Sequence, residues 1–316
     1  MSKTYTLYTR SNFDGIISAA LLKEIGIINK VEFVHPKDIQ DGKISLGKND
    51  ITVGLPYNPE VYMAFDHHSS EYIKTKDINE NYIIELASPS NAGIIYEYFG
   101  GKEKFSSNFN NLIDAVDKAN CVNFSQNDIL NPQGWVMLNF LTDPRTGLGR
   151  FKDFTISNYN LMLKLVDLCS KKTIDEIMLD SDILERIDLY NKEKEKNKEQ
   201  IKRCTKKEDS VYVVDLRNED IIHVGNRFVI YALFPDCRIS IHEFYGRQKQ
   251  NTVFAVGKSI LQKDCIIDLG AMLYELNGGG HMNAATCQVD NDKADDTLIE
   301  LITRIKNQEK YLSKDN

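Results

Sequence analysis

The sequence Phe65-Asp66-His67-His68 ends a short hydrophobic run, residues 61–65, and small polar residues follow it. A hydrophobic run of this length with a polar end is typical of a buried β-strand that meets a loop. A strand end is rigid, so side chains placed there converge with side chains from the ends of neighbouring strands. An acid and two imidazoles at this position are suited to a divalent metal ion, although a pair of loop histidines is also common without a metal.

The segments around this stretch alternate between strand-like and helical patterns. Strand-like runs rich in β-branched and aromatic residues lie at 4–8, 31–35, 50–56 and 61–65. Apolar helical patterns lie at 16–24, 92–99 and 112–120. This alternation predicts an α/β fold whose N-terminal sheet is mostly parallel and doubly wound, with helices on both faces. Ligands of such sheets bind at the carboxyl ends of the strands.

Asp14 follows the first strand and lies where the first helix begins, next to Gly15, which permits a tight turn. In a parallel sheet it shares an edge with His67, which follows the fourth strand. Two interpretations of Asp14 stay open: a metal ligand, or the N-cap of the helix, which is the most common role of Asp before a helix. Asp114 and Asp117 are three residues apart and lie on one helical face, either as ligands or as a solvated pair.

The composition narrows the class of protein. The chain has 316 residues, which predicts two domains, and 42% of them are hydrophobic, enough for packed cores. Its formal net charge of −7 argues against a broad basic face for long duplex nucleic acid. The six cysteines include no CxxC pair, which indicates reduced thiols. With no signal peptide and no apolar run of transmembrane length, we expect a cytoplasmic protein without a membrane partner.

A charged stretch, residues 191–200, alternates lysines and acids as an exposed helix does. We expect a helical connector around it and a second, smaller α/β domain after it. Strand-like runs of that domain lie at 211–215, 228–234, 238–244 and 252–256, and helical patterns at 268–276 and 297–305. The predicted divisions are an N-terminal domain at 1–155, a helical connector at 156–209 and a C-terminal domain at 210–316.

The second domain carries a glycine run with a candidate role in phosphate binding. Gly278, Gly279 and Gly280 can present consecutive backbone N–H groups to an anion. His281, which follows them, can donate to a phosphate oxygen, and Arg238 is a further candidate in the same domain. The alternative is a flexible glycine turn without a ligand.

A second dense stretch, residues 141–150, contains one proline and two glycines and predicts a loop. Its Arg145 and Arg150 suit phosphate or carboxylate oxygens, because a guanidinium donates two parallel hydrogen bonds. We expect a clamp on the substrate or between the domains. A plain turn with solvated arginines stays an alternative.

Three stretches together resemble the motifs of the DHH phosphoesterase superfamily. They are SNFDGIISAALL at 11–22, FDHHSSE at 65–71 and NGGGHMNAA at 277–285. The last resembles the glycine-rich signature of the DHH-associated C-terminal domain, which favours phosphate binding by the glycine run. DPRTGLGRF at 143–151 resembles the branch labelled exopolyphosphatase-like. The superfamily includes single-strand exonucleases, nanoRNases, cyclic-dinucleotide phosphodiesterases and manganese-dependent inorganic pyrophosphatases.

The resemblance implies roles for single residues. It implies that Asp14, His67 and Asp117 bind Mn²⁺ or Mg²⁺, with Asp114 as a less favoured alternative to Asp117. Oxygen-rich ligation with one imidazole suits these ions better than structural zinc. His68 would neutralise or protonate the leaving oxygen, and the adjoining Asp66 is retained with it as part of the catalytic group.

The chain departs from the family pattern at the positions of several ligands. The first motif normally supplies a His and two Asp, and the chain has Tyr8, Asn12 and Asp14 there. The second motif normally supplies an Asp that bridges two metals, and the nearest residues here are Gly54 and Thr52. The ligands that remain belong largely to one metal, so we expect one ion, with two as the alternative.

The expected function is that of a metal-dependent phosphoesterase that hydrolyses small phosphoesters in a cleft between the two domains. Short oligonucleotides, linear dinucleotides and nucleotide phosphates are the expected substrates. Polyphosphate ranks below them, because few basic residues line up to hold a long polyanion. The alternative is a catalytically degenerate relative that binds a nucleotide or phosphate ligand without turnover. The oligomeric state stays open, with a homodimer as one alternative.

Overall fold

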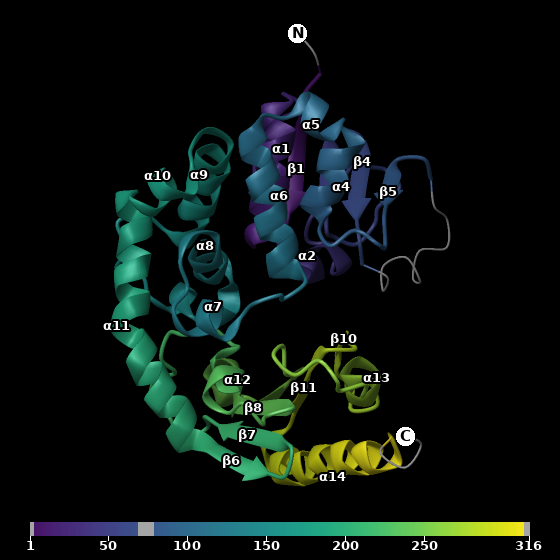
Figure 1. The fold of residues 1–316 in the computed structure, drawn as a ribbon. Coiled ribbons are helices and arrows are strands. Elements are labelled where there is room, and N and C mark those ends of the chain that lie inside the picture. Colours follow the sequence, from purple (N-terminus) through teal and green to yellow (C-terminus); the bar gives the residue numbers. More distant parts are fainter. Residues whose placement is uncertain (1–2, 69–78, 313–316) are drawn as a thin grey trace. The chain divides into compact units, whose positions relative to one another are not determined.

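A computed structural model of the chain describes residues 3–68 and 79–312 (Figure 1). The chain divides into two compact units. The first comprises Met1–Asn123 and Pro132–Tyr190, and the second comprises Phe124–Asn131 and Asn191–Asn316. Residues 69–71, which end the FDHHSSE stretch, lie outside the described residues.

The first unit is built on a five-stranded sheet. Its strands are β1 (Tyr5–Thr9), β2 (Ile28–Phe33), β3 (Asp50–Val53), β4 (Met63–Asp66) and β5 (Tyr82–Ile84). The spatial order is β2-β1-β3-β4-β5, and each neighbouring pair is parallel. The mostly parallel, doubly wound sheet predicted from the sequence is confirmed. In this order the winding reverses between β1 and β3, and ligands of such sheets bind outside the carboxyl ends of the strands at that reversal.

Helices flank this sheet. They are α1 (Phe13–Glu24), α2 (Pro36–Gln40), α4 (Asn91–Tyr98), α5 (Gly101–Lys104), α6 (Ser107–Asn120), α8 (Gly134–Thr142), α9 (Asn158–Lys171) and α10 (Ile174–Met178). Two short 3₁₀ helices, Pro144–Thr146 and Leu148–Arg150, follow α8. The long helix α11 (Ser181–Cys204) begins in the first unit and ends in the second.

Two neighbouring residues of β4 show that both faces of the sheet are covered. Side chains alternate between the faces of a strand. Ala64 packs in a cluster with Ile39 of α2, whereas the ring of Phe65 lies edge-on to Tyr98 of α4 with ring centroids 5.5 Å apart. Helix α1 is buried throughout residues 13–22 and contacts α4, α6, α8 and α9. A helix that is surrounded in this way needs apolar residues on every side, as α1 has.

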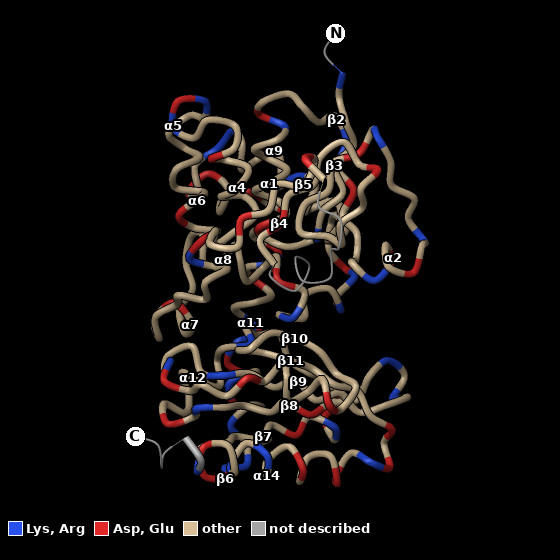
Figure 2. Tube along the Cα trace, turned by 90° about the vertical axis from the view of Figure 1, so that its right-hand side faces the viewer, with Lys and Arg blue, Asp and Glu red and all other residues tan. Residues whose placement is uncertain are grey.

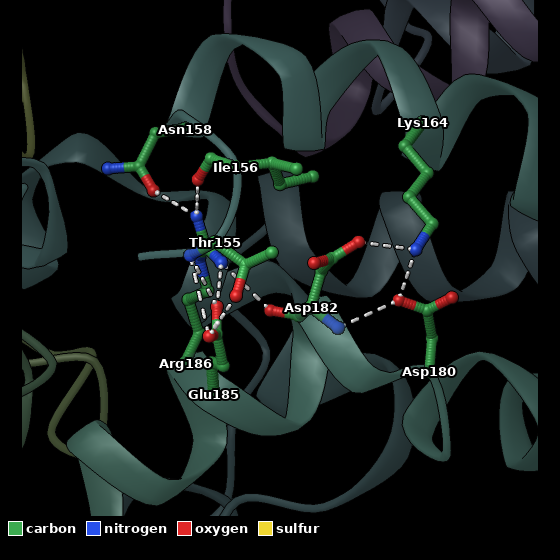
Figure 3. Close-up of polar contacts among 8 residues, drawn as sticks. All are labelled: Thr155, Ile156, Asn158, Lys164, Asp180, Asp182, Glu185 and Arg186. Atoms are coloured by element: carbon green, nitrogen blue, oxygen red, sulfur yellow. Dashed lines mark hydrogen bonds and ion pairs between the residues drawn. The ribbon is translucent and has the colours of Figure 1, made fainter. Parts of the chain in front are cut away.

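A polar cluster fixes the start of α11 to the loop before α9 (Figure 3). Arg186 is fully buried and donates to the carbonyl oxygens of Asp182 and Ile156 and, at 3.0 Å, to the carboxylate of Glu185. Its guanidinium also lies 3.8 Å from the ring centroid of Phe154. A buried cation is stable only when it is paired in this way.

The second unit contains a six-stranded sheet in the order β10-β11-β9-β8-β7-β6. Its strands are β6 (Thr205–Glu208), β7 (Val211–Asp215), β8 (Ile239–Tyr245), β9 (Thr252–Lys258), β10 (Gly279–His281) and β11 (Ala284–Val289). The β7–β8 pair is parallel, and the other four neighbouring pairs are antiparallel. Its helices are α7 (Gln126–Leu130), α12 (Val229–Leu233), α13 (Leu269–Tyr274) and α14 (Ala294–Leu312). A smaller α/β unit was predicted here, and it is confirmed.

One predicted strand of this unit is wrong. Residues 228–234 form helix α12, Val229–Leu233, and most of them are buried. A short, wholly apolar run fits a buried strand and a buried helix equally well, because it carries no periodicity that separates them. The tertiary packing of the run therefore decides its form.

The charges of the chain are dispersed. Figure 2 shows basic and acidic residues interspersed along the trace of each unit. Within residues 3–68 and 79–312, no helix combines the length and hydropathy needed to cross a membrane.

Candidate active site

The structure at the start of α1 shows that Asp14 is not the N-cap of this helix. Asn12 is the N-cap of the helix, and its side-chain oxygen accepts from Gly15 N at 2.9 Å. Asp14 lies in the first turn and is only 5% exposed. A Cβ atom at Gly15 would come within 2.1 Å of the carbonyl oxygen of Arg10, so this turn requires glycine. The asparagine that replaces a family acid therefore caps the helix, and Asp14 is left for another role.

The carboxylate of Asp14 accepts four hydrogen bonds. Its Oδ1 accepts from Ala92 N at 2.9 Å, and its Oδ2 accepts from Asn91 N at 3.2 Å and from Asn91 Nδ2 at 3.0 Å. The Nδ2 atom of Asn120, at the end of α6, also donates to Oδ2 at 3.2 Å. A carboxylate at the N-terminus of a helix is stabilised by the unpaired N–H groups and by the helix dipole. Asp14 thus joins the starts of α1 and α4 to the end of α6.

Asp66 orients the two histidines that follow it. It is fully buried, and its Oδ1 accepts from His67 N at 2.8 Å and from His68 N at 3.1 Å. The same oxygen lies 2.5 Å from Nδ1 of the His68 ring, and Tyr82 Oη lies 3.5 Å from the other carboxylate oxygen. A carboxylate bound to Nδ1–H fixes the tautomer of an imidazole and leaves Nε2 as its reactive atom. The structure therefore joins Asp66 and His68 in one group.

His67 has a different partner from His68. Its Nδ1 lies 3.1 Å from the carbonyl oxygen of Ser88. Because a carbonyl oxygen only accepts, Nδ1 of His67 carries the proton and Nε2 offers its lone pair. Histidines that bind metals commonly have this second bond to a carbonyl or carboxylate.

Asp117 lies in the neighbourhood of Asp14 and His67. Its Oδ1 accepts from Ser90 Oγ at 2.5 Å. Burial raises the pKa of Asp117, and the charges of Asp14 and Asp114 raise it further, against the opposing effects of Ser90 and His67. Asp114 is exposed on the same helix. Asp117 is the more buried of the two acids and lies nearer the other predicted ligands, but its role as a ligand stays a prediction.

At the positions that depart from the family pattern, the residues of this chain have structural roles in the sheet. Tyr8 and Thr52 are paired across β1 and β3, inside the sheet. Gly54 follows β3 with φ +62°, and a Cβ atom there would lie 2.8 Å from Nδ2 of Asn91. Two buried polar atoms of this region, Thr52 Oγ1 and Asn91 Oδ1, have no hydrogen-bond partner among the described residues. Buried polar atoms without a hydrogen-bond partner are rare, and an ion or a water commonly binds them.

The types of residue at this site suit a divalent ion. Carboxylate, imidazole and amide oxygen donors suit Mn²⁺ or Mg²⁺, and the orphaned Asn91 oxygen offers an acceptor. In the part of the chain that the structure describes, however, no three or more His, Cys, Asp or Glu side chains are grouped as metal ligands. The assignment of Asp14, His67 and Asp117 as ligands stays a prediction.

Both arginines predicted as a clamp lie close to their own loop, and Arg145 has a partner there. Arg145 donates through Nε and Nη2 to both oxygens of Asp143, at 2.7 and 2.9 Å. The guanidinium of Arg150 lies over Gly147, where a Cβ atom would come within 2.0 Å of it, and burial lowers the pKa of Arg150. Their role in substrate binding stays a prediction.

Arg10 is a candidate that the sequence reasoning missed. It follows β1 at the carboxyl edge of the sheet. Desolvation and the nearby Arg145 lower the pKa of Arg10, whereas the charges of Asp14 and Asp66 raise it. An arginine within range of two site carboxylates is suited to a phosphate. Its position directly after a strand was the available signal.

The glycine run of the second unit forms a strand instead of a concave anion site. Gly279, Gly280 and His281 make up β10, which pairs with β11 and is exposed. Consecutive N–H groups of an extended strand point in opposite directions, so the expected nest is not formed by these three residues. Close packing also requires glycine at two positions. A Cβ atom at Gly280 would lie 2.4 Å from Ala284 O, and a Cβ atom at Gly278 would lie 2.5 Å from Thr286 O.

Arg238 lies apart from this strand. It precedes β8, which is three positions from β10 in the sheet order. It pairs with Asp264 at 3.0 Å and with Glu309 at 3.7 Å. With strands about 4.8 Å apart, roughly 14 Å separate β8 from β10. The structure does not bring Arg238 to the glycine run, and binding of substrate by Arg238 or His281 stays a prediction.

Two solved structures resemble the whole chain. One is a pGpG-specific phosphodiesterase, PggH from Vibrio cholerae, with a TM-score of 0.84 and 44% identity over 96% of this chain and 99% of that chain. The other is RecJ from Thermus thermophilus in complex with Mn²⁺, with a TM-score of 0.61 and 13% identity over 96% of this chain and 52% of that chain. The second likeness shows the fold alone. A scan against family models finds no match, and a search of curated proteins finds none.

Proposed function

The chain belongs to the DHH phosphoesterase superfamily, and we propose that it is a metal-dependent phosphodiesterase that hydrolyses small linear dinucleotides, with pGpG as the first substrate to test. The observation that carries this proposal is the 44% identity, over almost the full length of both chains, with a phosphodiesterase specific for pGpG. Hydrolysis of pGpG adds one water and yields two molecules of GMP. Short oligonucleotides and nucleotide phosphates are further candidates.

The cofactor we propose is Mn²⁺ or Mg²⁺, one ion per chain, bound by Asp14, His67 and Asp117. Such an ion, when bound, polarises a phosphoryl oxygen and lowers the pKa of a bound water. His67 supports this role, because its Nδ1–H donates to Ser88 O and leaves Nε2 for the ion. The proposed single ion rests on Tyr8, Asn12 and Gly54, which stand where the family pattern has the histidine and aspartate ligands of a second one.

His68 is the proposed proton donor to the leaving oxygen. Asp66 holds Nδ1 of His68 at 2.5 Å, and two backbone N–H bonds to the same oxygen fix the loop around it. When the ring is protonated on both nitrogens, this arrangement presents Nε2–H in one orientation, as general acid catalysis requires. Asp66 is buried and acts through His68, so we propose a positioning role for it.

A small substrate agrees with the charge distribution. Basic and acidic residues are interspersed along the trace of each unit, as Figure 2 shows, which favours a small substrate over a long polyanion. Arg10, Arg145 and Arg150 are the cations proposed to bind phosphate in the first unit, and His281 in the second. Polyphosphate therefore ranks below dinucleotides despite the exopolyphosphatase-like motif. The six free cysteines support a reducing, cytoplasmic location, and a homodimer stays an open alternative.

The competing proposal is a protein that binds a nucleotide without hydrolysing it. Tyr8, Asn12 and Gly54 favour it, because they remove donors that the family uses. The intact Asp66–His68 pair favours catalysis, because a binding protein has no need of an oriented proton donor.

The test is incubation of the purified protein with pGpG and Mn²⁺, followed by chromatography of the nucleotides. We expect stoichiometric formation of GMP that stops when the metal is chelated. Inorganic polyphosphate and a mixed set of dinucleotides serve as competing substrates. Binding of pGpG, measured by calorimetry, without any GMP would establish the binding protein instead.

A further inference from the structure

A short segment, residues 88–92, contacts three of the site residues predicted from the sequence. It ends the loop after β5 and begins α4. The ring of His67 lies 3.1 Å from it, and it donates to the carboxylates of Asp117 at 2.5 Å and Asp14 at 2.9 Å. These three residues come from different parts of the first unit: after β4, in α6 and at the start of α1. The family-like motifs of the sequence do not include this segment, which joins them in the structure.

Ser90 is the central residue of this segment, because its one hydroxyl makes two hydrogen bonds. As the N-cap of α4, its Oγ accepts from Gly93 N at 2.9 Å. The same Oγ donates to Oδ1 of Asp117 at 2.5 Å. A hydroxyl carries one proton and two lone pairs, so the two bonds form together. Ser90 is fully buried, and a hydrogen bond in a buried site is stronger than one exposed to water.

The bond from Ser90 uses one oxygen of the Asp117 carboxylate and leaves the other. Oδ2 of Asp117 makes no hydrogen bond or ion pair within residues 3–68 and 79–312. Gly93 keeps the space beside this contact, since a Cβ atom there would lie 3.1 Å from Ser90 Oγ and 3.5 Å from Asp117 Oδ1. Short bonds from a hydroxyl to a carboxylate are among the stronger hydrogen bonds in proteins. Ser90 therefore restricts the rotation of the carboxylate and leaves Oδ2 available to the site.

We propose that Ser90 is a positioning residue of the candidate site: it acts through Asp117, whose carboxylate it holds in one orientation. The inference rests on the proposed function, in which Asp117 takes part. The alternative is that Ser90 only caps α4. A cap needs the bond to Gly93 N alone, whereas the bond to Asp117 reaches another helix, α6, 27 positions along the chain. Capping therefore does not explain the second bond, which carries the inference.

The first experiment compares the variants Ser90→Ala and Ser157→Ala. Ser157 is the matched control, because it is the N-cap of α9 and accepts from Asn160 N at 3.1 Å, outside the candidate site. Both variants lose an N-cap, so both should melt below the wild type. Only Ser90→Ala should also lower kcat for pGpG, by about 10- to 100-fold, as removal of a group that orients a ligand does, with a smaller change in KM. Initial rates well below both melting temperatures measure this difference.

Two further measurements separate positioning from a loss of structure. Ser90→Thr keeps a hydroxyl that can make both bonds, so it should retain most of the activity that Ser90→Ala loses. Calorimetry of Mn²⁺ binding without substrate gives a readout that does not depend on turnover. Because Asp117 is a proposed ligand, the affinity should fall about 10- to 100-fold in Ser90→Ala and stay unchanged in Ser157→Ala.

The outcomes separate this inference from the proposed function. If the wild type neither hydrolyses pGpG nor binds Mn²⁺, the proposed function is wrong and this inference falls with it. If it binds Mn²⁺ without hydrolysis, the affinity comparison still decides the role of Ser90. If the wild type is active and Ser90→Ala matches Ser157→Ala in rate and affinity, Ser90 is only a helix cap. A folded Ser90→Thr variant as inactive as Ser90→Ala would also overturn the positioning role, because the hydroxyl would then make no difference.

Discussion

Two polar clusters of the first unit, around Arg186 and around Asp14, differ in which buried atoms have no hydrogen-bond partner. At Arg186 the buried guanidinium donates to backbone oxygens and to Glu185, and only its Nε has no partner among the described residues (Figure 3). At Asp14 the carboxylate accepts four hydrogen bonds, and the amide oxygen of the adjoining Asn91 has no partner among the described residues. The Arg186 cluster stabilises the fold because most of its polar groups bond to each other. A buried acceptor without a partner, as at Asn91, is commonly satisfied by a water or an ion.

The largest effect is expected at His68. His68→Asn should lower the rate of pGpG hydrolysis by about 10²- to 10⁴-fold, the usual contribution of a positioned acid or base. The side chain of His68 is 23% exposed and Asp66 keeps its bonds to the backbone, so the melting temperature should change little. Initial rates at saturating Mn²⁺ and thermal melts measure the two effects.

The matched control for this prediction is His35→Asn. His35 is the N-cap of α2 and accepts from Lys37 N at 3.1 Å, a role that asparagine also performs. The control should retain both activity and stability. Full activity in His68→Asn would show that His68 has no part in the mechanism.

The opposite pattern is expected at Arg186. Arg186→Met should lower the free energy of unfolding by about 2–4 kcal/mol, because it leaves buried carbonyl oxygens and Glu185 without their donor. Affinity for Mn²⁺ should not change, since no group of this cluster belongs to the candidate site. Urea unfolding and calorimetry measure the two quantities.

Lys164 provides the comparison for Arg186. It bridges Asp180 and Asp182, both at 2.6 Å, but its side chain is 32% exposed (Figure 3). Pairs near the surface contribute about 0–1 kcal/mol, so Lys164→Met should destabilise the protein less than Arg186→Met. Equal losses in the two variants would show that burial does not set the stability of this cluster.

The sequence predicted the scaffold of the site well. Alternating strands and helices placed Asp14 and the Asp66-His67-His68 run at the carboxyl edge of a parallel sheet, and that sheet is confirmed. The prediction succeeded because the direction of β1 and β4 in a parallel sheet fixes which edge their ends share. It needed no knowledge of side-chain contacts.

The contacts within the site could not be predicted in the same way. Asn12 and Asp14 are both suitable N-caps, and only the backbone geometry shows that Asn12 performs the role. Asn91 lies 77 positions from Asp14 along the chain, so its bond to that carboxylate has no local signal. Helix α12 was predicted as a strand because its apolar run has no period. In each case tertiary packing supplies the missing information.

The smallest effect concerns Glu243 of the second unit, a third buried polar group. Glu243 is fully buried, its carboxylate makes no hydrogen bond among the described residues, and Nη1 of Arg217 lies 3.0 Å from Oε1. Burial raises the pKa of Glu243 to about 7, against the opposing charge of Arg217. The folded protein therefore binds a proton that the unfolded chain has lost above about pH 4.5.

The sign of the pH dependence follows from this. Stability should fall as the pH rises from about 4.5 through 7, because the folded state retains its proton longer than the unfolded state does. Glu243→Gln removes the titration, so the variant should gain stability relative to the wild type, on the order of 1 kcal/mol, between pH 5 and pH 8. Urea unfolding at both pH values measures the difference, with Glu300→Gln, exposed on α14, as the control. A variant with the same pH dependence as the wild type would mean that the ion pair with Arg217 already keeps Glu243 ionised in the folded protein.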